Sequence, residues 1–206
     1  MSLSAQLASG EYPVLVLELE IPEGVAAEFA AAVLSIKHSA SRLELEIQQL
    51  ASPQDIATHS IAFSAEIASE TSEVSGALGT GRFVLFWSPE PQENWASNFR
   101  VVCFARSPLE TDIGREADSS DVLWQWMTSS LANSGAEFSA LAGTTTRIIS
   151  SGHGMMEKES EHAEIEIRAS WSPLGTEIHR HFEAWQNLIC VMSDLPIAPG
   201  VQDLAS

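Results

Sequence analysis

The chain has 206 residues, of which 45% are apolar and 18% are charged. This composition supports a sizeable core, rules out global disorder and favours one large domain. Acidic residues outnumber basic residues 28 to 10, which gives a formal net charge of −18. Such a charge argues against nucleic-acid binding through a basic surface and against attachment to anionic membranes.

Cysteine usage and hydropathy indicate the compartment. Cys103 and Cys190 lie far apart inside apolar segments, which is typical of small buried hydrophobes and not of a disulfide framework. No apolar run approaches the ~18 residues that a membrane span needs. The N-terminal region lacks the basic stretch of a signal peptide. We therefore expect a cytoplasmic protein without membrane partners.

The first half of the chain predicts mainly strands. Residues 1–11 are expected to form a flexible tail, followed by one domain over 12–200 and a second tail at 201–206. Apolar and acidic residues alternate at the end of segment 12–21, which predicts a half-buried strand. Apolar residues at helical spacing predict a helix between Val25 and Ile36. Further strands are expected at 43–48, 60–67, 82–87 and 99–106, and the continuous apolar run 82–87 predicts a central strand covered on both faces.

The second half predicts two more helices and a long hairpin. Ser120 or Asp121 can begin a helix that Gly135 ends. Strands are expected at 138–150 and 162–171, and Ser172 and Pro173 then resemble the first residues of a helix that runs to about Met192. The resulting order, β-α-ββββ-α-ββ-α, predicts an α+β fold: a mostly antiparallel sheet with about three helices on one face.

Several segments resemble a known family. They are TGRFVLF, the following Trp95, FRVVCFAR, the Trp-x-Trp pair of the second helix, AEIEIRASWSPLG and HFEAW. Together they are similar to the actinobacterial conserved-hypothetical family known as domain of unknown function number three thousand. The resemblance implies a cytoplasmic protein and supplies no catalytic residues, because that family has no assigned activity. The element order is also similar to the secretion-chaperone or YbjN-like arrangement, whose members are small, acidic and often dimeric.

The sequence offers no complete metal or catalytic site. Glu177–His181 and His179–Glu183 are pairs at helical i, i+4 spacing, but no third or fourth ligand is apparent nearby. The segment SSGHG (150–154) is better explained as a hairpin turn than as a nucleophile site, because it lacks the required strand-turn-helix context. We therefore expect neither a stoichiometric metal nor a cofactor.

Candidate binding residues come from the rare basic side chains and from paired tryptophans. Four arginines fall on expected strands, and they form either a ladder of ion pairs or a local anion site. Trp124 and Trp126 stand two positions apart on a helix, so one of them should be partly exposed, either as packing or as a binding anchor. The full set of candidate binding residues is Arg100, Arg106, Arg147, Arg168, Trp124, Trp126 and His181.

A specific anion site follows if some of these residues converge. Arg168 precedes the expected helix start at Ser172, where free backbone N–H groups favour an anion. Arg147 lies in the strand that should pair with the strand of Arg168. His181 lies about two turns into the following helix and is the better histidine for a polar contact. Convergence of the three would create the most basic spot on an acidic chain.

The leading hypothesis is a non-enzymatic binding or adaptor protein whose partner is a protein or an anionic small molecule. The alternative is a small-molecule-binding accessory protein or enzyme with an Arg-lined anion site, linked through the family resemblance to haem metabolism. The strand expected at 12–21 has an apolar face and an unpaired edge. We expect it to dock on its own sheet or to pair across a homodimer.

Overall fold

The computed structural model describes residues 19, 21, 24–68, 79–90, 93–109, 119–154 and 162–195. Within this part of the chain the helices are α1 (Ala27–Lys37), α3 (Ser119–Asn133) and α4 (Ile178–Met192). The strands are β1 (Leu45–Leu50), β2 (His59–Ile67), β3 (Thr80–Trp87), β4 (Phe99–Leu109), β5 (Phe138–Ser150) and β6 (His162–Pro173). The expected tails, nearly all of the strand expected at 12–21, and residues 69–78 and 110–118 lie outside the described residues.

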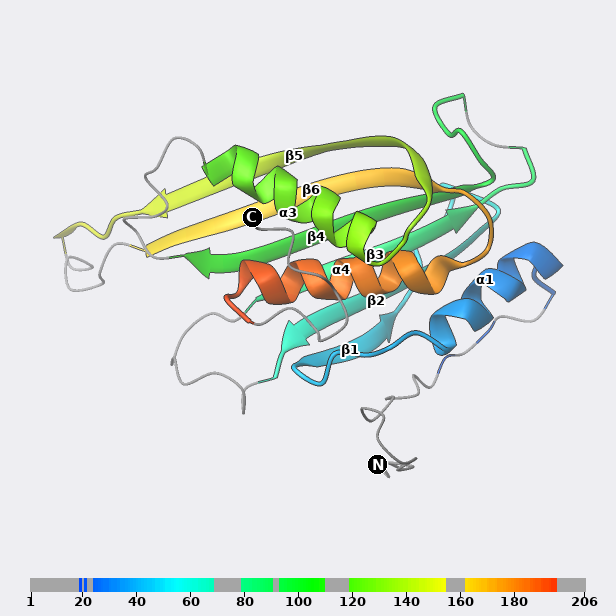
Figure 1. The fold of residues 1–206 in the computed structure, drawn as a ribbon, viewed down its shortest axis with the longest axis horizontal. Coiled ribbons are helices and arrows are strands. Elements are labelled where there is room, and N and C mark those ends of the chain that lie inside the picture. The colour runs from blue at the N-terminus through cyan, green and yellow to red at the C-terminus, as the bar shows by residue number, and fades with distance from the viewer. Residues whose placement is uncertain are drawn as a thin grey trace.

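The strands form one antiparallel sheet in the order β1-β2-β3-β4-β6-β5. Helices α3 and α4 run across the same side of this sheet, and α1 packs beside α4 (Figure 1). From α1 onward the element order is the predicted one, so the α+β class is confirmed. Leu19 and Ile21, the described residues of segment 12–21, pack against the core.

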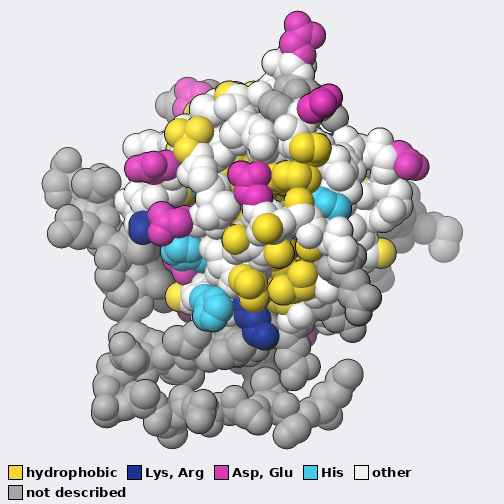
Figure 2. Space-filling model, turned by 90° about the vertical axis from the view of Figure 1, so that its right-hand side faces the viewer, with side chains coloured by type: hydrophobic (Ala, Val, Ile, Leu, Met, Phe, Trp, Pro, Cys, Tyr) yellow, Lys and Arg dark blue, Asp and Glu magenta, His cyan; other side chains and the backbone are white. Residues whose placement is uncertain are grey.

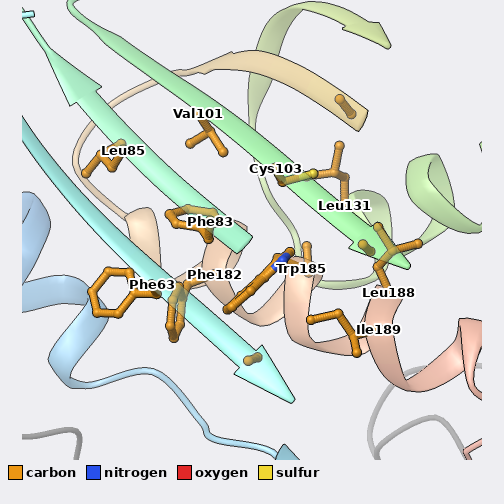
Figure 3. Packing of buried hydrophobic residues seen from close by; sticks show 14 of the residues in the cluster. Phe63, Phe83, Leu85, Val101, Cys103, Leu131, Phe182, Trp185, Leu188 and Ile189 are labelled. Carbon is orange, nitrogen blue, oxygen red and sulfur yellow. The ribbon is translucent and has the colours of Figure 1, made fainter. Parts of the chain in front are cut away.

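The core lies between the helices and the facing side of the sheet. Every second residue of β2, β3, β4 and β6 points into it, as strand alternation requires. Phe182 of α4 packs its ring against Phe63 and Phe83, with ring centroids 4.9 Å and 5.3 Å away (Figure 3). Trp185 lies one turn further along α4 and contacts the same cluster. The apolar stripe predicted for this helix is therefore its buried face.

Gly81 lets α4 approach β3 closely. A Cβ atom at this position would lie 2.4 Å from Cδ1 of Ile189 and 2.9 Å from Nε1 of Trp185. The indole Nε1 of Trp185 instead donates a hydrogen bond to the backbone oxygen of Phe104, at 3.2 Å. The missing side chain thus allows a large aromatic residue of the helix to reach the sheet backbone.

The predicted helix start at Ser172–Pro173 is wrong. Both residues belong to β6, where Pro173 pairs with Phe138 and Ser172 pairs with Ser139. Pairing with β5 has prevailed over the local capping pattern, and α4 begins only at Ile178, after a turn in which Gly175 has φ +89°. The helix-terminal N–H groups that an anion site was expected to use are therefore not at Ser172.

The sequence predicts that the strand at 82–87 is central and covered on both faces, and only the first part of this prediction is right. This segment belongs to β3, which is central in the sheet, and one of its faces packs under the helices. On its other face Phe86 is buried against Trp95, but Val84 is half-buried and Arg82 is exposed. Side chains on that face therefore remain open to a partner.

Candidate functional site

The helix-free side of the sheet is the most distinctive surface of the described protein. Strand register places alternate residues of all six strands on this side, which we call the open face. Glu46 of β1 and Glu66 of β2 face each other across one of its ends. Toward its centre, Val84 of β3 pairs with Val102 of β4.

Four arginines lie on the open face: Arg82, Arg100, Arg106 and Arg168. They are half of the eight basic residues in the described part of the chain. The sequence pattern indicated Arg100, Arg106 and Arg168 as candidate binding residues but did not single out Arg82. The continuous apolar run that follows Arg82 hid its alternation, and the pairing of Arg82 with Phe104 across β3 and β4 reveals it.

Two of these arginines form ion pairs whose acids are less exposed than their bases. Arg168 donates from Nε to the carboxylate of Glu166 at 2.7 Å, and the side chains are 67% and 12% exposed. Arg106 pairs with Glu164, and here too the arginine side chain is the more exposed of the two. Two ion pairs are thus present with their guanidinium groups outermost, one within β6 and one between β4 and β6. These guanidinium groups remain available to a second anionic partner, because a planar guanidinium has five donors.

Apolar side chains fill the space between the arginines. The ring of Phe104 lies between Arg82 on β3 and Arg168 on β6, with the guanidinium carbon of Arg168 5.7 Å from the ring centroid. Val102 remains 41% exposed beside it. A surface that combines arginine and aromatic side chains around an apolar centre is typical of protein interfaces.

Arg100 is held by neutral groups alone. Its guanidinium donates to the backbone oxygen of Ala140 at 3.0 Å and to the hydroxyls of Ser172 and Ser170. A bulge in β5 presents this carbonyl, with Ala140 at φ +51°. Burial lowers the pKa of Arg100, and no carboxylate of the described residues pairs with it. Arg100 is therefore a fixed positive charge whose Nε–H edge keeps donor capacity for an anion.

The convergence expected for Arg147, Arg168 and His181 does not occur. Arg147 pairs with Ile165 and lies on the helix side of the edge strand, whereas Arg168 lies on the open face. His181 lies on the buried face of α4 and is 2% exposed, and its Nδ1 accepts a hydrogen bond from the indole of Trp171 at 2.9 Å. The sheet therefore separates Arg168 from His181, because strand register decides which face of the sheet each side chain takes.

The paired tryptophans are packing residues on the helix side. Both Trp124 and Trp126 are half-buried on α3 and adjoin the core. A Cβ atom on Gly143 of β5 would come within 2.7 Å of the Trp124 ring. Trp124 therefore covers the edge strand, in agreement with the packing alternative, and contributes nothing to the open face.

A shallow hollow of ≈310 Å³ lies at one end of the molecule, between α1 and the start of α4. The end face in Figure 2 presents apolar side chains together with histidines. Ser35 and His179 line the hollow, and their side chains bond each other at 3.0 Å. Glu183 accepts a hydrogen bond from the backbone N–H of Ala40, and His181 accepts one from the indole of Trp171. The described residues contain no cluster of three metal-ligating side chains, and the absence of a stoichiometric metal stays a prediction.

Comparisons with known proteins identify a family without assigning an activity. No curated protein and no solved structure shows significant similarity to the chain, so the YbjN-like arrangement stays a prediction. In the part of the chain that the structure describes, no helix has the length and apolarity needed to cross a membrane. A family model described as protein of unknown function (DUF3000) matches residues 25–202, which include every described helix and strand. The chain therefore belongs to the DUF3000 family.

Proposed function

We propose that this protein is a non-enzymatic, cytoplasmic binding or adaptor protein that engages a protein partner through the open face. One observation carries the proposal: half of the described basic residues surround an apolar centre on the face that none of the described helices covers. A chain of net charge −18 would gain nothing in solubility by gathering cations around exposed Val102. Arginine and aromatic residues around an apolar centre are the side chains that anchor protein interfaces.

Two matched substitutions test this proposal. Val102 on the open face and Leu34 on α1 are 41% and 44% exposed, so a glutamate at either position adds the same charge to a similar surface. Tagged protein is used to capture partners from a lysate of the native host, and the captured proteins are quantified by mass spectrometry. We expect Val102→Glu to reduce specific partners at least ~10-fold, because an unpaired charge in an interface costs several kcal/mol. Leu34→Glu should retain them. Equal capture by both variants contradicts the proposal.

Arg100 supports a second candidate, an accessory protein that binds an anionic small molecule. Its guanidinium is immobilised by three neutral acceptors and needs one carboxylate or phosphate to balance its charge. Acetate and inorganic phosphate are suitable probes, and the side-chain Nε–H resonance of Arg100 is the readout. Saturable shifts at this resonance, with much smaller shifts at the Nε–H resonances of the exposed Arg82 and Arg168, support the candidate. Equal shifts at all surface arginines contradict it, because they indicate general ion screening.

A further inference from the structure

We infer that the part of the partner that docks on the open face is an extended acidic segment in which two carboxylates flank one apolar side chain, in the order acid-x-apolar-x-acid. This inference rests on the proposed function, because it names the chemistry of the segment that binds the same surface. It follows from two arginines without a carboxylate partner, from the valines between them and from the spacing of the strands.

Two arginines of the open face lack an acidic partner. Arg106 and Arg168 already have glutamate partners within the sheet. Among the described residues, no carboxylate pairs with Arg82 or Arg100. Arg82 is exposed, and Arg100 is half-buried and held by neutral groups. Although the chain carries 28 acidic residues, these two guanidinium groups are therefore available to the carboxylates of a partner.

The hydrogen bonds of Arg100 leave room for one carboxylate. A guanidinium has five N–H donors. Nη1 donates to the backbone oxygen of Ala140 and to the hydroxyl of Ser172, and Nη2 donates to the hydroxyl of Ser170. The donors that remain are Nε–H and one Nη2–H, which lie on neighbouring nitrogens of a planar group. Two neighbouring donors and a single positive charge match one carboxylate, whereas a phosphate group carries up to two negative charges.

The two arginines stand at opposite ends of an apolar centre. Val84 lies two positions from Arg82 on β3, and Val102 lies two positions from Arg100 on β4. Because these strands are antiparallel, Val84 and Val102 pair with each other, and the arginines lie on opposite sides of them. We call Val84 and Val102 the valine pair. A segment that crosses the valine pair along the strands therefore meets a guanidinium group before it and another after it.

The spacing of these groups matches an extended segment. Arg82 lies opposite Phe104, which is four positions along β4 from Arg100. At about 3.4 Å per residue, this separation is roughly 14 Å, with the valine pair at its middle. Alternate side chains of an extended segment are about 7 Å apart, so positions i, i+2 and i+4 match one arginine, the valine pair and the other arginine. Ala62 and Ser170 border the valine pair, so the apolar centre fits a single side chain and not the broad apolar stripe of a helix.

Local charge favours an acidic segment although the whole chain is acidic. At physiological salt, exposed charges more than about 8 Å apart are largely screened from each other. Arg82 and Arg100 lie two positions along the strands from the valine pair. On the described strands, the closest glutamates of the open face are Glu66 and Glu166, and both lie four positions from the valine pair. A segment on the valine pair therefore experiences mainly the two arginines.

Two peptides of equal composition test the inference by isothermal titration calorimetry at physiological salt. The probe is acetyl-Gly-Glu-Thr-Leu-Thr-Glu-Gly-amide, and the control, acetyl-Gly-Glu-Glu-Thr-Thr-Leu-Gly-amide, lacks the required spacing. We expect the wild-type protein to bind the probe at least ~10-fold more tightly, because the control can satisfy only one arginine. Val102→Glu should abolish binding of the probe, whereas Leu34→Glu, at a similarly exposed position on α1, should leave it unchanged. Equal binding of the two peptides overturns the inference.

Double-mutant cycles assign each carboxylate to one arginine. Arg82→Gln and Arg100→Gln are combined with probes in which either glutamate is replaced by glutamine. We expect each arginine to couple to one glutamate, and the two arginines to couple to different glutamates. Arg180→Gln removes the same charge from α4 and should show no coupling. Coupling of both arginines to one glutamate, or to neither, overturns the inference. Arg82 is exposed, so its cycle stands even if Arg100→Gln unfolds.

Failure of this inference is distinguishable from failure of the proposed function. The inference is overturned if the probe does not bind, as expected when a second copy or another part of this chain fills the open face. It is also overturned if acetate binds as tightly as the probe, because the ligand is then a small anion. If Val102→Glu nevertheless loses specific partners from lysate while Leu34→Glu retains them, the open face binds a protein through other contacts and the proposed function stands. If the probe binds as expected but both variants capture partners equally, the proposed function fails and the peptide site is supported.

Discussion

His181 links the stability of the core to pH. Its Nδ1 accepts the indole hydrogen of Trp171, so the ring must be neutral with its proton on Nε2. Burial, and then the positive charges of neighbouring residues on α4, lower the pKa of His181 from 6.5 to about 4. The unfolded chain therefore binds a proton that the folded chain does not bind between these two values.

We expect the free energy of unfolding to fall as the pH drops from 6.5 toward 4, because His181 is protonated first in the unfolded chain. The group contributes at most ~1.4 kcal/mol per pH unit, and its contribution is fully present above pH 6.5. Urea unfolding of wild type and His181→Gln, measured across this range, should show a shallower pH dependence for the variant. The matched control is His179→Gln, which removes a half-exposed histidine of the same helix. Equal slopes for wild type and His181→Gln contradict the prediction.

Arg42 fastens the segment before β1 to α4. It forms a two-bond pair with Glu44 and donates to Asn187 of α4 at 3.1 Å, while its backbone N–H donates to Gln186 at 2.8 Å. Burial opposes its charge, but the hydrogen bonds to Glu44 raise the pKa of Arg42 overall. The same pairing lowers the pKa of Glu44. The pair is thus partly buried, and each charge depends on the other.

Removing one member of this pair should be costly. Arg42→Met leaves the Glu44 carboxylate without its partner, and we expect a loss of roughly 3 kcal/mol in the free energy of unfolding by urea. Arg42→Met combined with Glu44→Gln should recover part of that loss, because the uncompensated charge is then gone. Arg180→Met is the control, since its exposed 3.5 Å pair with Glu177 is worth below ~1 kcal/mol. Similar losses for Arg42→Met and Arg180→Met would contradict a structural role for Arg42.

The two cysteines are isolated core residues. Burial raises the pKa of both Cys103 and Cys190 to about 12. Thiols react as thiolates, so the folded protein should react with iodoacetamide only after it unfolds. Mass spectrometry after labelling, with and without urea, measures this difference. Rapid labelling of either residue without denaturant would show that its segment opens readily.

At the scale of elements, the contact between β3 and α4 depends on a missing side chain. Gly81→Ala would place a methyl group 2.4 Å from Cδ1 of Ile189, so the helix or the side chain must move. We expect a loss of about 1–3 kcal/mol in the free energy of unfolding, as for other overpacked cores. Adding Ile189→Val removes the closest atom and should recover part of the loss. Additive effects of the two substitutions would show that the positions are not coupled.

The length and the hydrophobic period of a segment decided whether its secondary structure could be predicted. Long periodic segments such as the residues of α4 and β6 bury one continuous stripe, and the period fixes their type. The end of β6 could not be predicted, because Ser172 and Pro173 fit a helix start locally. Their pairing with Ser139 and Phe138, more than thirty residues earlier in the chain, decided the matter. Such pairing is invisible to a local pattern.

At the scale of the whole molecule, two exposed arginines offer a test of which side of the sheet matters. Arg168→Ala removes a guanidinium from the open face, whereas Arg147→Ala removes one from the opposite side of the neighbouring strand. We expect Arg168→Ala to weaken partner binding strongly, while the melting temperature changes little because an exposed ion pair contributes below ~1 kcal/mol. Binding is measured by the capture experiment and unfolding by calorimetry. Unfolding by Arg168→Ala, or equal binding by the two variants, would make Arg168 a structural residue.

The sequence by itself determined the α+β class and the element order from the first helix onward. These features follow from the hydrophobic period, which acts between neighbours along the chain. Only the tertiary structure decided which candidates meet. Strand register placed Arg82 beside Phe104 and put Arg147 on the side opposite Arg168. The packing of α4 buries His181 in the core, away from the arginines of the open face. A shift of one residue in register exchanges the two faces of a sheet, so the composition of a binding face depends on partners distant in sequence.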